Sequence, residues 1–310
     1  MKDMLVTLIG GGGFLGRYVA QELFAAGARV RVVQPRPRDA WFIKTLGGLG
    51  QTQFAAADIR KPETLARALQ GSDAVVNLVG VLAGDFEGVH VDGARNVAEA
   101  AAAAGATTLI HVSAIGADPN SAADYGRTKG EGEIAVRKAF PDATIFRPSI
   151  LFGREDAFVN RFAGMIANTP VAVPVLRAEA KFQPAYVADV AQAIAQAIMD
   201  PAAHAGQTYS LGGPDVISMI DLFKWIAGTI QRDVPFVALP DAIGGVIPFL
   251  PFAPITRDQW RMLGTDNVVP AGEQGFAAFG IVPTPLATVA PAWMVRFRKA
   301  GRFGKARAAA

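Results

Sequence analysis

The sequence has no cysteine among its 310 residues, which excludes disulfide bonds and thiolate metal sites. It has only three histidines, which argues against a metal site built from histidine. No apolar run reaches the roughly 18 residues that a membrane-spanning helix needs. The longest such stretch, 242–255, is interrupted by Pro248, Pro251 and Pro254. A signal peptide is not expected either, because strand-like residues begin at Met4. We therefore expect an intracellular, cytoplasmic protein.

What the sequence does contain is an apolar stretch that runs directly into a glycine-rich turn. Residues 4–9 are strand-like, Gly10, Gly13 and Gly16 are evenly spaced, and residues 14–26 have the pattern of an amphipathic helix. Glycines permit a sharp turn and let the backbone approach phosphates closely. The helix that follows offers N–H groups and the positive end of its dipole. This strand–turn–helix context predicts the pyrophosphate site of a dinucleotide.

Strand-like and helix-like segments alternate along the first half of the chain. The expected strands are 4–9, 29–34, 53–57, 74–79, 108–113, 144–146 and 207–211, and the expected helices are 14–26, 40–46 capped by Asp39, 62–69, an alanine-rich helix ending near Gly105, 122–140, 186–199 capped by Asp189, and 220–229. Such β–α units predict an α/β fold with a doubly wound parallel sheet of the Rossmann type. We assign residues 1–150 to a dinucleotide-binding domain, with elements near 184–212 returning to it. Residues 151–310 are assigned to a smaller, irregular C-terminal region that meets a substrate or partner.

The end of the second strand bears on the choice of cofactor. A carboxylate there would bind the ribose 2′-hydroxyl of NAD. This chain instead has Gln34, followed by Arg36 and Arg38. Arginine pairs well with a 2′-phosphate, so the pattern favours NADPH over NADH. The alternative is that these arginines are solvated loop residues.

Further candidate contacts follow the other strands, since ligands bind at the carboxyl ends of the strands in open α/β sheets. Asp58 could accept from the adenine amino group, Gly80 permits close passage of the cofactor, and Pro148 is expected near the nicotinamide carboxamide. The complete set of predicted cofactor contacts is Gly10, Gly13, Phe14, Leu15, Gly16, Arg36, Asp58, Ile59, Val79, Gly80, Tyr125, Lys129 and Pro148.

Three residues form a candidate catalytic set. Tyr125 and Lys129 are four apart and so share one face of a helix, and Ser113 closes the fifth expected strand. We expect the Lys129 ammonium to lower the pKa of the Tyr125 phenol, so that the phenol exchanges a proton with a substrate oxygen. Ser113 would hydrogen-bond that oxygen, and Lys129 could also hold the nicotinamide ribose.

At this point residues 4–215 resemble the short-chain dehydrogenase/reductase superfamily in its atypical or extended branch. The segment His90–Val97 is similar to the fourth-helix motif of that branch, which often has Asn where this chain has His90. His90 is interpreted here first as a helix-packing residue.

A narrower resemblance involves residues 140–163, 182–191, 209–214 and 256–260. These segments are similar to the NADPH-binding, dehydrogenase-like accessory subunit of respiratory complex I and its bacterial relatives. The resemblance implies tight NADPH binding with a structural or assembly role, and it does not imply turnover. Within the first segment, Arg154, Glu155 and Asp156 are interpreted as a charged helix start, with the acidic residues in the first turn, and the alternative is that they contact a substrate.

The C-terminal third contains two further features. We expect the apolar, proline-interrupted stretch 243–255 to form either a lid over the substrate pocket or a surface that meets a partner. Aromatic residues interleave with a basic cluster made of Arg296, Arg298, Lys299, Arg302, Lys305 and Arg307. This mixture suits an anionic membrane surface or an acidic subunit, and the alternative is a disordered tail. Nucleic acid is not an expected partner, because the rest of the chain lacks a basic face.

Two functions remain open from the sequence. The first is an NADPH-binding accessory subunit of complex I, peripheral to the bacterial inner membrane. The second is a freestanding NAD(P)-dependent oxidoreductase or epimerase/dehydratase that acts on a carbonyl or alcohol through Ser113, Tyr125 and Lys129. A nucleotide-sensing regulator is a third possibility, and it would need neither Tyr125 nor Lys129.

Overall fold

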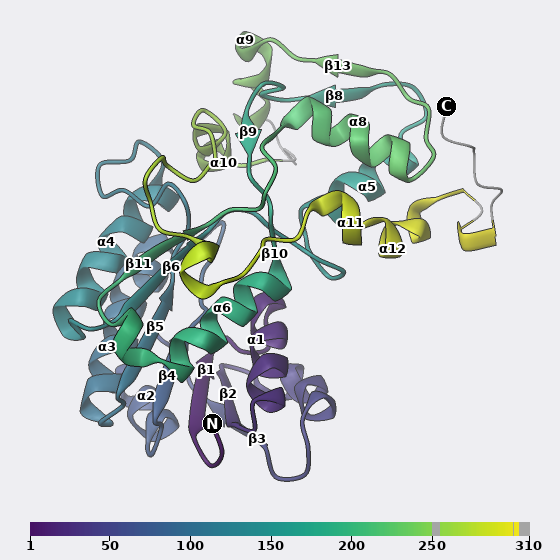
Figure 1. Cartoon of the computed structure of the whole chain (residues 1–310). Helices are drawn as coiled ribbons and strands as arrows, with labels where there is room; N and C mark the ends of the chain where they lie inside the picture. Colours follow the sequence, from purple (N-terminus) through teal and green to yellow (C-terminus); the bar gives the residue numbers. More distant parts are fainter. Residues whose placement is uncertain (250–254, 300, 304–310) are drawn as a thin grey trace. The chain divides into compact units, whose positions relative to one another are not determined.

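The computed structural model describes residues 1–249, 255–299 and 301–303, and the chain divides into two compact units (Figure 1). Unit 1 consists of Met1–Pro148, Val187–Leu211 and Pro270–Val282. Unit 2 consists of Ser149–Tyr186, Gly212–Val269 and Pro283–Ala310. The chain therefore leaves unit 1 after its sixth strand and returns to it twice.

A single parallel sheet forms the centre of unit 1. Its strands are β1 (Leu5–Ile9), β2 (Arg29–Gln34), β3 (Thr52–Ala56), β4 (Ala74–Asn77), β5 (Thr108–Val112), β6 (Thr144–Pro148) and β11 (Thr208–Leu211). Their order in the sheet is β11-β6-β5-β4-β1-β2-β3. The direction of winding reverses between β4 and β1, and ligands of doubly wound sheets bind at such a switch point.

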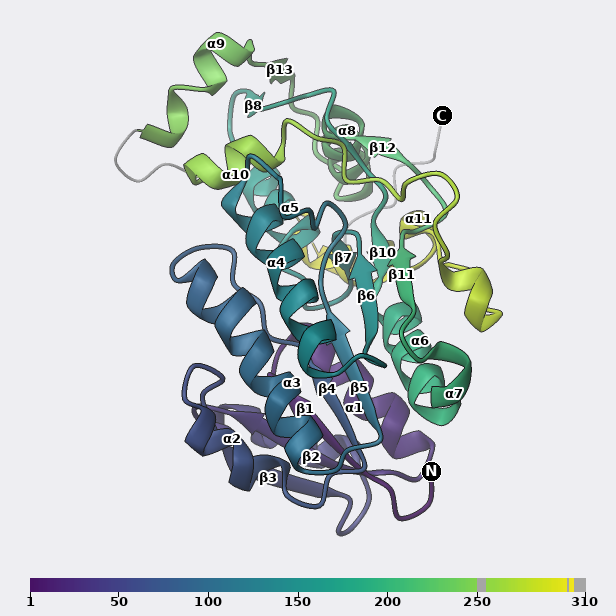
Figure 2. The same ribbon diagram turned by 90° about the vertical axis from the view of Figure 1, so that its left-hand side faces the viewer.

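Helices cover both faces of this sheet. On one face α1 (Phe14–Ala25) packs beside α6 (Val187–Met199), which leads into the short α7 (Pro201–His204). On the other face α2 (Pro62–Leu69), α3 (Gly93–Ala103) and α4 (Asp124–Ala139) lie side by side (Figure 2). The predicted doubly wound parallel sheet is confirmed.

Burial explains why these segments become strands. Every residue of β1, β4 and β5 is buried, and continuous apolar runs are typical of parallel strands with both faces covered. Between the sheet and α2 and α3, a core forms around Val75, Leu109, Leu65 and Val97. A π-helical turn, η2 (Glu87–Asp92), runs directly into α3.

Unit 2 is built from short elements around its own core. Its strands are β7 (Leu151–Phe152), β8 (Val173–Val175), β9 (Lys181–Phe182), β10 (Ala185–Tyr186), β12 (Ile217–Ser218) and β13 (Phe236–Ala238), and its α-helices are α5 (Val159–Asn168), α8 (Met219–Thr229), α9 (Asp241–Gly244), α10 (Arg257–Met262), α11 (Leu286–Val289) and α12 (Pro291–Met294). Among the described residues these strands form three two-stranded sheets, β10–β7, β12–β9 and β13–β8. Phe152, Leu222 and Met294 lie in the core of this unit.

Two predicted helix caps are wrong. Asp39 lies inside the 3₁₀ helix η1 (Pro37–Leu46), and its carboxylate pairs with the Arg36 guanidinium instead of capping residues 40–46. Asp189 lies within the first turn of α6, which begins at Val187. A cap needs extended backbone just before the helix, and the residue type alone does not reveal that backbone conformation.

Asp156 does support the start of a helix. This buried carboxylate accepts N–H groups from Gly153, Phe158 and Asn160, at 3.1, 2.9 and 3.1 Å. Its bonds hold the turn from which α5 begins at Val159. The interpretation placed Asp156 in the charged first turn of a helix, and this is wrong, because α5 begins only at Val159 and Asp156 acts from the turn before it.

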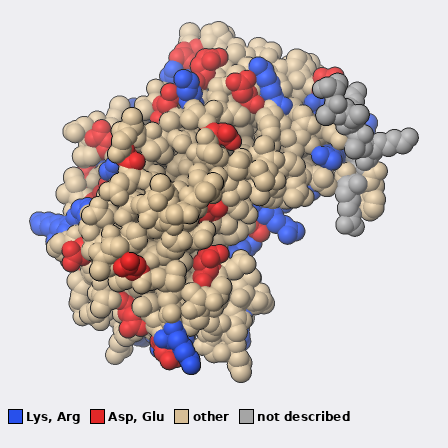
Figure 3. Space-filling view, viewed as in Figure 1, with Lys and Arg blue, Asp and Glu red and all other residues tan. Residues whose placement is uncertain are grey.

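The helix lengths and the surface charge of the described residues agree with the sequence pattern. Within the described ranges, every helix is too short or too polar to cross a lipid bilayer. On the face drawn in Figure 3, lysine and arginine side chains are interspersed with aspartate and glutamate side chains. This mixture agrees with a formal net charge of only +3. Residues 250–254, part of the apolar stretch 243–255, lie outside the described residues.

Gly132 provides a test of how α4 packs. A Cβ atom at Gly132 would lie 2.1 Å from the His90 carbonyl oxygen, so Gly132→Ala must displace backbone. We expect this substitution to lower the free energy of unfolding by about 2 kcal/mol, although alanine favours a helix. Gly228→Ala in α8 is the control, because a Cβ there meets nothing within 4 Å. It should be neutral or stabilise by about 0.5–1 kcal/mol. Urea unfolding measures both, and equal effects would contradict the packing.

Candidate functional site

The glycine-rich turn after β1 is folded so tightly that side chains are excluded. Gly10 has a φ of +77°, and a Cβ atom there would lie 3.0 Å from the Val79 side chain. A Cβ atom on Gly16 would lie 2.4 Å from the Gly11 carbonyl oxygen. The turn thus brings the end of β1 against the loop that follows β4, on the side of the switch point.

Helix α1 begins from this turn in a form suited to an anion. Gly13 is the N-cap residue, and within the described chain α1 has neither a side-chain cap nor an acidic residue in its first turn. Its first N–H groups and its positive dipole end therefore have no carboxylate competing for them. Phe14 and Leu15 open the helix at this point. This is the arrangement that a pyrophosphate requires.

The loop after β2 is exposed and rich in arginine. The Arg36 side chain is 85% exposed and pairs with Asp39 at 3.1 Å. Sequence reasoning missed Arg17, whose guanidinium lies 4.4 Å from the centre of the Phe42 ring in η1. Its position directly after Gly16, the last glycine of the turn, could have predicted that it lies near the pyrophosphate site. Both cations follow strands that end at the same edge of the sheet.

Asp58 and Ile59, after β3, are engaged with their own neighbours. The Asp58 carboxylate binds the Arg60 guanidinium at 2.8 Å, and this hydrogen bond lowers the pKa of the Asp58 carboxyl. The Ile59 side chain lies in the core, and its carbonyl accepts from Asn96 at 2.8 Å. Asp58 can still accept a further hydrogen bond, whereas Ile59 contributes mainly to packing.

Lys129 is the buried cation of the site. Its side chain comes from α4, its Nζ donates to the Val112 carbonyl at 3.2 Å, and it would lie 3.1 Å from a Cβ atom on Gly80. Burial lowers the pKa of Lys129 to about 8, partly opposed by the nearby Glu133 carboxylate. The ammonium is thus fixed between the loop after β4 and the end of β5.

Ser113 follows β5 and presents an orphaned hydroxyl. Its N–H donates to the Phe146 carbonyl at 2.7 Å, which fixes the backbone, but its buried Oγ has no hydrogen-bond partner among the residues that the structure describes. Buried hydroxyls are normally bonded, so this oxygen fits a ligand atom. Pro148, at the end of β6, is buried, and its carbonyl accepts from Ile115 at 3.1 Å.

The expected effect of Lys129 on Tyr125 is wrong in direction. Burial raises the pKa of the Tyr125 phenol to about 12 rather than lowering it. A phenolate loses solvation in this position, and burial is the cause of the rise. Tyr125 therefore keeps its proton over the physiological range in this state.

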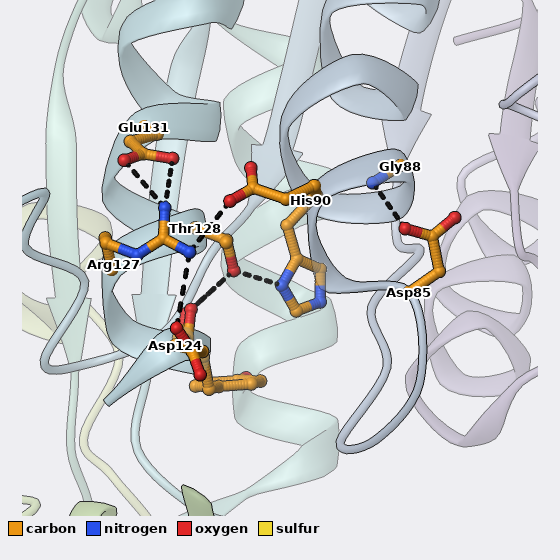
Figure 4. Close-up of polar contacts among 9 residues, drawn as sticks. Asp85, Gly88, His90, Asp124, Arg127, Thr128 and Glu131 are labelled. Atoms are coloured by element: carbon orange, nitrogen blue, oxygen red, sulfur yellow. Dashed lines mark hydrogen bonds and ion pairs between the residues drawn. The ribbon is translucent and has the colours of Figure 1, made fainter. Parts of the chain in front are cut away.

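His90 contacts both the loop after β4 and helix α4. Its ring is buried and meets the Tyr125 ring edge to face, with centres 5.3 Å apart. The Val81 N–H donates to Nε2 at 3.0 Å, and Nδ1 lies 3.0 Å from Thr128 Oγ1 (Figure 4). Phe86 packs against the other two rings. The helix-packing role expected for His90 thus comes with two directed hydrogen bonds.

A second buried histidine lies close by. The Asn77 amide, at the end of β4, lies 3.2 Å from His111 Nδ1 on β5, and its Oδ1 accepts from the Val79 N–H at 3.1 Å. Burial, followed by the Lys129 charge, lowers the pKa values of both His90 and His111 to about 3. Sequence reasoning did not single out His111 or Thr128, because their roles depend on contacts between distant elements.

Comparison with known proteins fits this geometry. The model of the NAD dependent epimerase/dehydratase family matches residues 6–212. The chain therefore belongs to this family of extended short-chain dehydrogenase/reductase proteins.

Among its relatives, the mitochondrial NADH dehydrogenase [ubiquinone] 1 alpha subcomplex subunit 9 of Mus musculus is 36% identical over 92% of this chain and 78% of its own length. The ceramide reductase of Caulobacter vibrioides is 33% identical over 60% of this chain and 58% of its own length. The triphenylmethane reductase of Citrobacter sp., solved with NADP(H), shares the fold with a TM-score of 0.73 at 19% identity, over 91% of this chain and 97% of that one.

The residues present fit a nicotinamide dinucleotide, which this family binds. The uncapped α1, the tight turn at Gly10 and Gly16, the close approach of Gly80 to Lys129 and the orphaned Ser113 hydroxyl lie along one edge of the sheet. Lys129 would hold the nicotinamide ribose, and the N–H groups of α1 would hold the pyrophosphate.

The low pKa of Lys129 can be tested through stability. Between about pH 8 and 10.5 the folded Lys129 has lost its proton while the unfolded lysine keeps it, so the unfolded state binds more protons. The free energy of unfolding should therefore rise with pH, by on the order of 3 kcal/mol relative to Lys129→Met. Denaturant unfolding of both proteins at several pH values measures this difference. A difference that stays constant with pH would show an ordinary lysine pKa.

Proposed function

We propose that this protein binds NADPH and serves as an accessory or assembly subunit of respiratory complex I, peripheral to the inner membrane of a bacterium. The observation that carries the proposal is the extent of the similarity to the mouse subunit. The family model stops at residue 212, whereas the mouse match covers 92% of the chain. The similarity therefore includes much of unit 2, beyond the residues that the family model matches.

NADPH is favoured by the cations at the adenosine end. Arg36 lies after β2 in an exposed ion pair, which is weak enough to exchange for a phosphate. Arg17 lies in the first turn of α1, directly after the glycine-rich turn. The Arg38 guanidinium lies 5.8 Å from the centre of the Trp41 ring. A guanidinium binds phosphate in a bidentate manner, and no carboxylate at the end of β2 is placed for the 2′-hydroxyl of NAD.

The choice of nucleotide can be tested with Arg36→Ala. This change should weaken NADPH binding about tenfold and change NADH binding by less than about twofold, because only NADPH carries the 2′-phosphate. Arg95→Ala is the matched control, since Arg95 also forms an exposed ion pair with an aspartate three positions away. Fluorescence titration measures all the affinities. Equal losses for NADPH and NADH would rule out a 2′-phosphate contact at Arg36.

The basic C-terminus supports association with a membrane or an acidic partner. Part of this cluster belongs to the packed structure of unit 2: Arg298 donates to the Thr229 carbonyl at 3.1 Å, and Arg296 to the Arg154 carbonyl at 3.3 Å. Lys305 and Arg307 lie outside the described residues, as does the side chain of Arg302. Deletion from Pro291 onward would also remove Met294, which is fully buried, so charge substitution is the cleaner test.

Replacing Arg302, Lys305 and Arg307 by glutamine should reduce recovery with membrane-bound complex I several-fold. Each cation near an anionic surface contributes about 1 kcal/mol. NADPH affinity should be unchanged. The matched control replaces the exposed Arg67, Arg95 and Lys138, which removes the same charge elsewhere. Membrane fractionation and affinity purification from the native host provide the measurement. Undiminished recovery of the first variant would count against the basic cluster.

The experiment for the whole proposal is native purification with identification of the bound nucleotide and the co-purifying proteins. Recovery of the chain with complex I subunits and bound NADPH supports it. Recovery as a nucleotide-free chain without those subunits would overturn it.

A freestanding reductase is the second candidate, favoured by the orphaned Ser113 hydroxyl beside an intact Tyr125 and Lys129. In that case the reduced nicotinamide supplies the hydride when bound. Ser113 and Tyr125 hydrogen-bond the carbonyl oxygen, and Tyr125 gives it a proton. NADPH oxidation by a carbonyl compound that Tyr125→Phe abolishes would favour this alternative.

A further inference from the structure

The imidazole of His90 connects three separate segments of unit 1. It comes from the π-helical turn η2, accepts from the backbone of the loop after β4, and bonds to the first turns of α4. In Figure 4 the ring lies between its own turn and α4, pointing toward Thr128. An ion pair of 2.7 Å between Glu87 and Arg127 also ties η2 to α4, but it lies at the surface.

The hydrogen bonds of His90 fix its protonation state. The Val81 N–H can only donate, so Nε2 must accept and Nδ1 must carry the ring proton. Nδ1 then donates to Thr128 Oγ1, whose own proton goes to the Asp124 carbonyl at 2.8 Å. The result is one directed chain from the loop after β4, through the ring, to the start of α4. An imidazolium could not accept from Val81 and would add a second cation near Lys129.

This chain of hydrogen bonds sets the distance between Gly80 and Lys129, the two groups that would face a nicotinamide ribose. Gly80 precedes Val81, and a Cβ atom on Gly80 would lie 3.1 Å from Lys129 Nζ and 3.8 Å from His90 Nε2. The same ring supports Tyr125 edge to face. Movement of the ring would therefore shift the backbone at Gly80, the Tyr125 ring and the turn that carries Lys129.

We propose that neutral His90 is a positioning residue for the nicotinamide end of the cofactor site, acting through Val81 and Thr128 and touching no ligand itself. The proposal rests on the proposed dinucleotide binding. It predicts that His90 matters for the nicotinamide half of the ligand and not for the adenosine half. The adenosine half is held by the glycine-rich turn and the loop after β2.

The test compares two ligands, NADPH and its fragment 2′-phospho-ADP, which keeps the pyrophosphate but lacks the whole nicotinamide riboside. His90→Phe keeps an aromatic ring but removes both hydrogen bonds and leaves the Val81 N–H without its acceptor. NADPH affinity should fall about tenfold, with fragment affinity changed by less than about twofold. His90→Gln should restore most of the NADPH affinity, because its amide can accept from Val81 and donate to Thr128. Thr128→Val breaks the same chain and should reproduce the His90→Phe pattern.

The matched control is His204→Phe, which removes another buried histidine of unit 1, one bonded to the Tyr209 hydroxyl at 2.7 Å. It should lower stability without separating the two affinities. If the wild-type chain binds neither NADPH nor NADH, the proposed function fails. If it prefers NADH, then NADH and ADP replace the two probes. Suppose instead that the wild-type chain binds a dinucleotide. The positioning role is then overturned if His90→Phe or Thr128→Val weakens the binding of dinucleotide and fragment by the same factor, or if the variant leaves both affinities unchanged. Thr128→Val decides the matter if His90→Phe does not fold.

Discussion

The candidate site depends on how closely α4 packs against the π-helical turn at His90. Gly132 permits this approach, because any side chain there would collide with the His90 carbonyl. The close packing lets the imidazole reach Thr128, and it brings Tyr125 against the His90 ring and Lys129 to the loop at Gly80. A π-helical turn is less stable than regular helix and often marks a functional position. Here the π-helical turn directs the His90 ring toward α4. Gly132, which permits the close approach, costs α4 some intrinsic helix stability.

The close packing also buries a charge, and the surrounding groups are arranged to tolerate it. Burial disfavours the Lys129 ammonium, and Glu133 offsets part of that cost while it pairs with Arg147. Two histidines lie near Lys129, and both stay neutral because burial and the lysine charge lower their pKa values to about 3. Neutral imidazoles still orient their neighbours through hydrogen bonds without adding repulsion. Around Lys129, the two histidines therefore contribute directed but uncharged dipoles, and Glu133 provides the compensating charge.

The positions of most candidate residues could be predicted from the sequence, because a parallel sheet gathers the residues after each strand at one edge. What failed depends on burial and on backbone conformation. The pKa of Tyr125 rises because its phenol is desolvated, which residue spacing does not reveal. Asp39 and Asp189 have the right residue type for caps but lie inside their helices. Thr128 and His111 acquire their roles from partners 34 or more positions away, which local patterns cannot show.

The pKa values of Lys129 and Tyr125 favour binding of a dinucleotide more than proton transfer to a substrate. At neutral pH a lysine with a pKa of about 8 is still mostly protonated and can donate to ribose hydroxyls, so Lys129 suits binding as it stands. A phenol with a pKa of about 12 is a weak proton donor, so Tyr125 would need an additional nearby positive charge to act as a general acid. Ser113, Tyr125 and Lys129 can thus all be present in a protein that binds its dinucleotide without oxidising or reducing it. An accessory subunit does not have to lose Ser113, Tyr125 or Lys129, and their presence is compatible with both candidate functions.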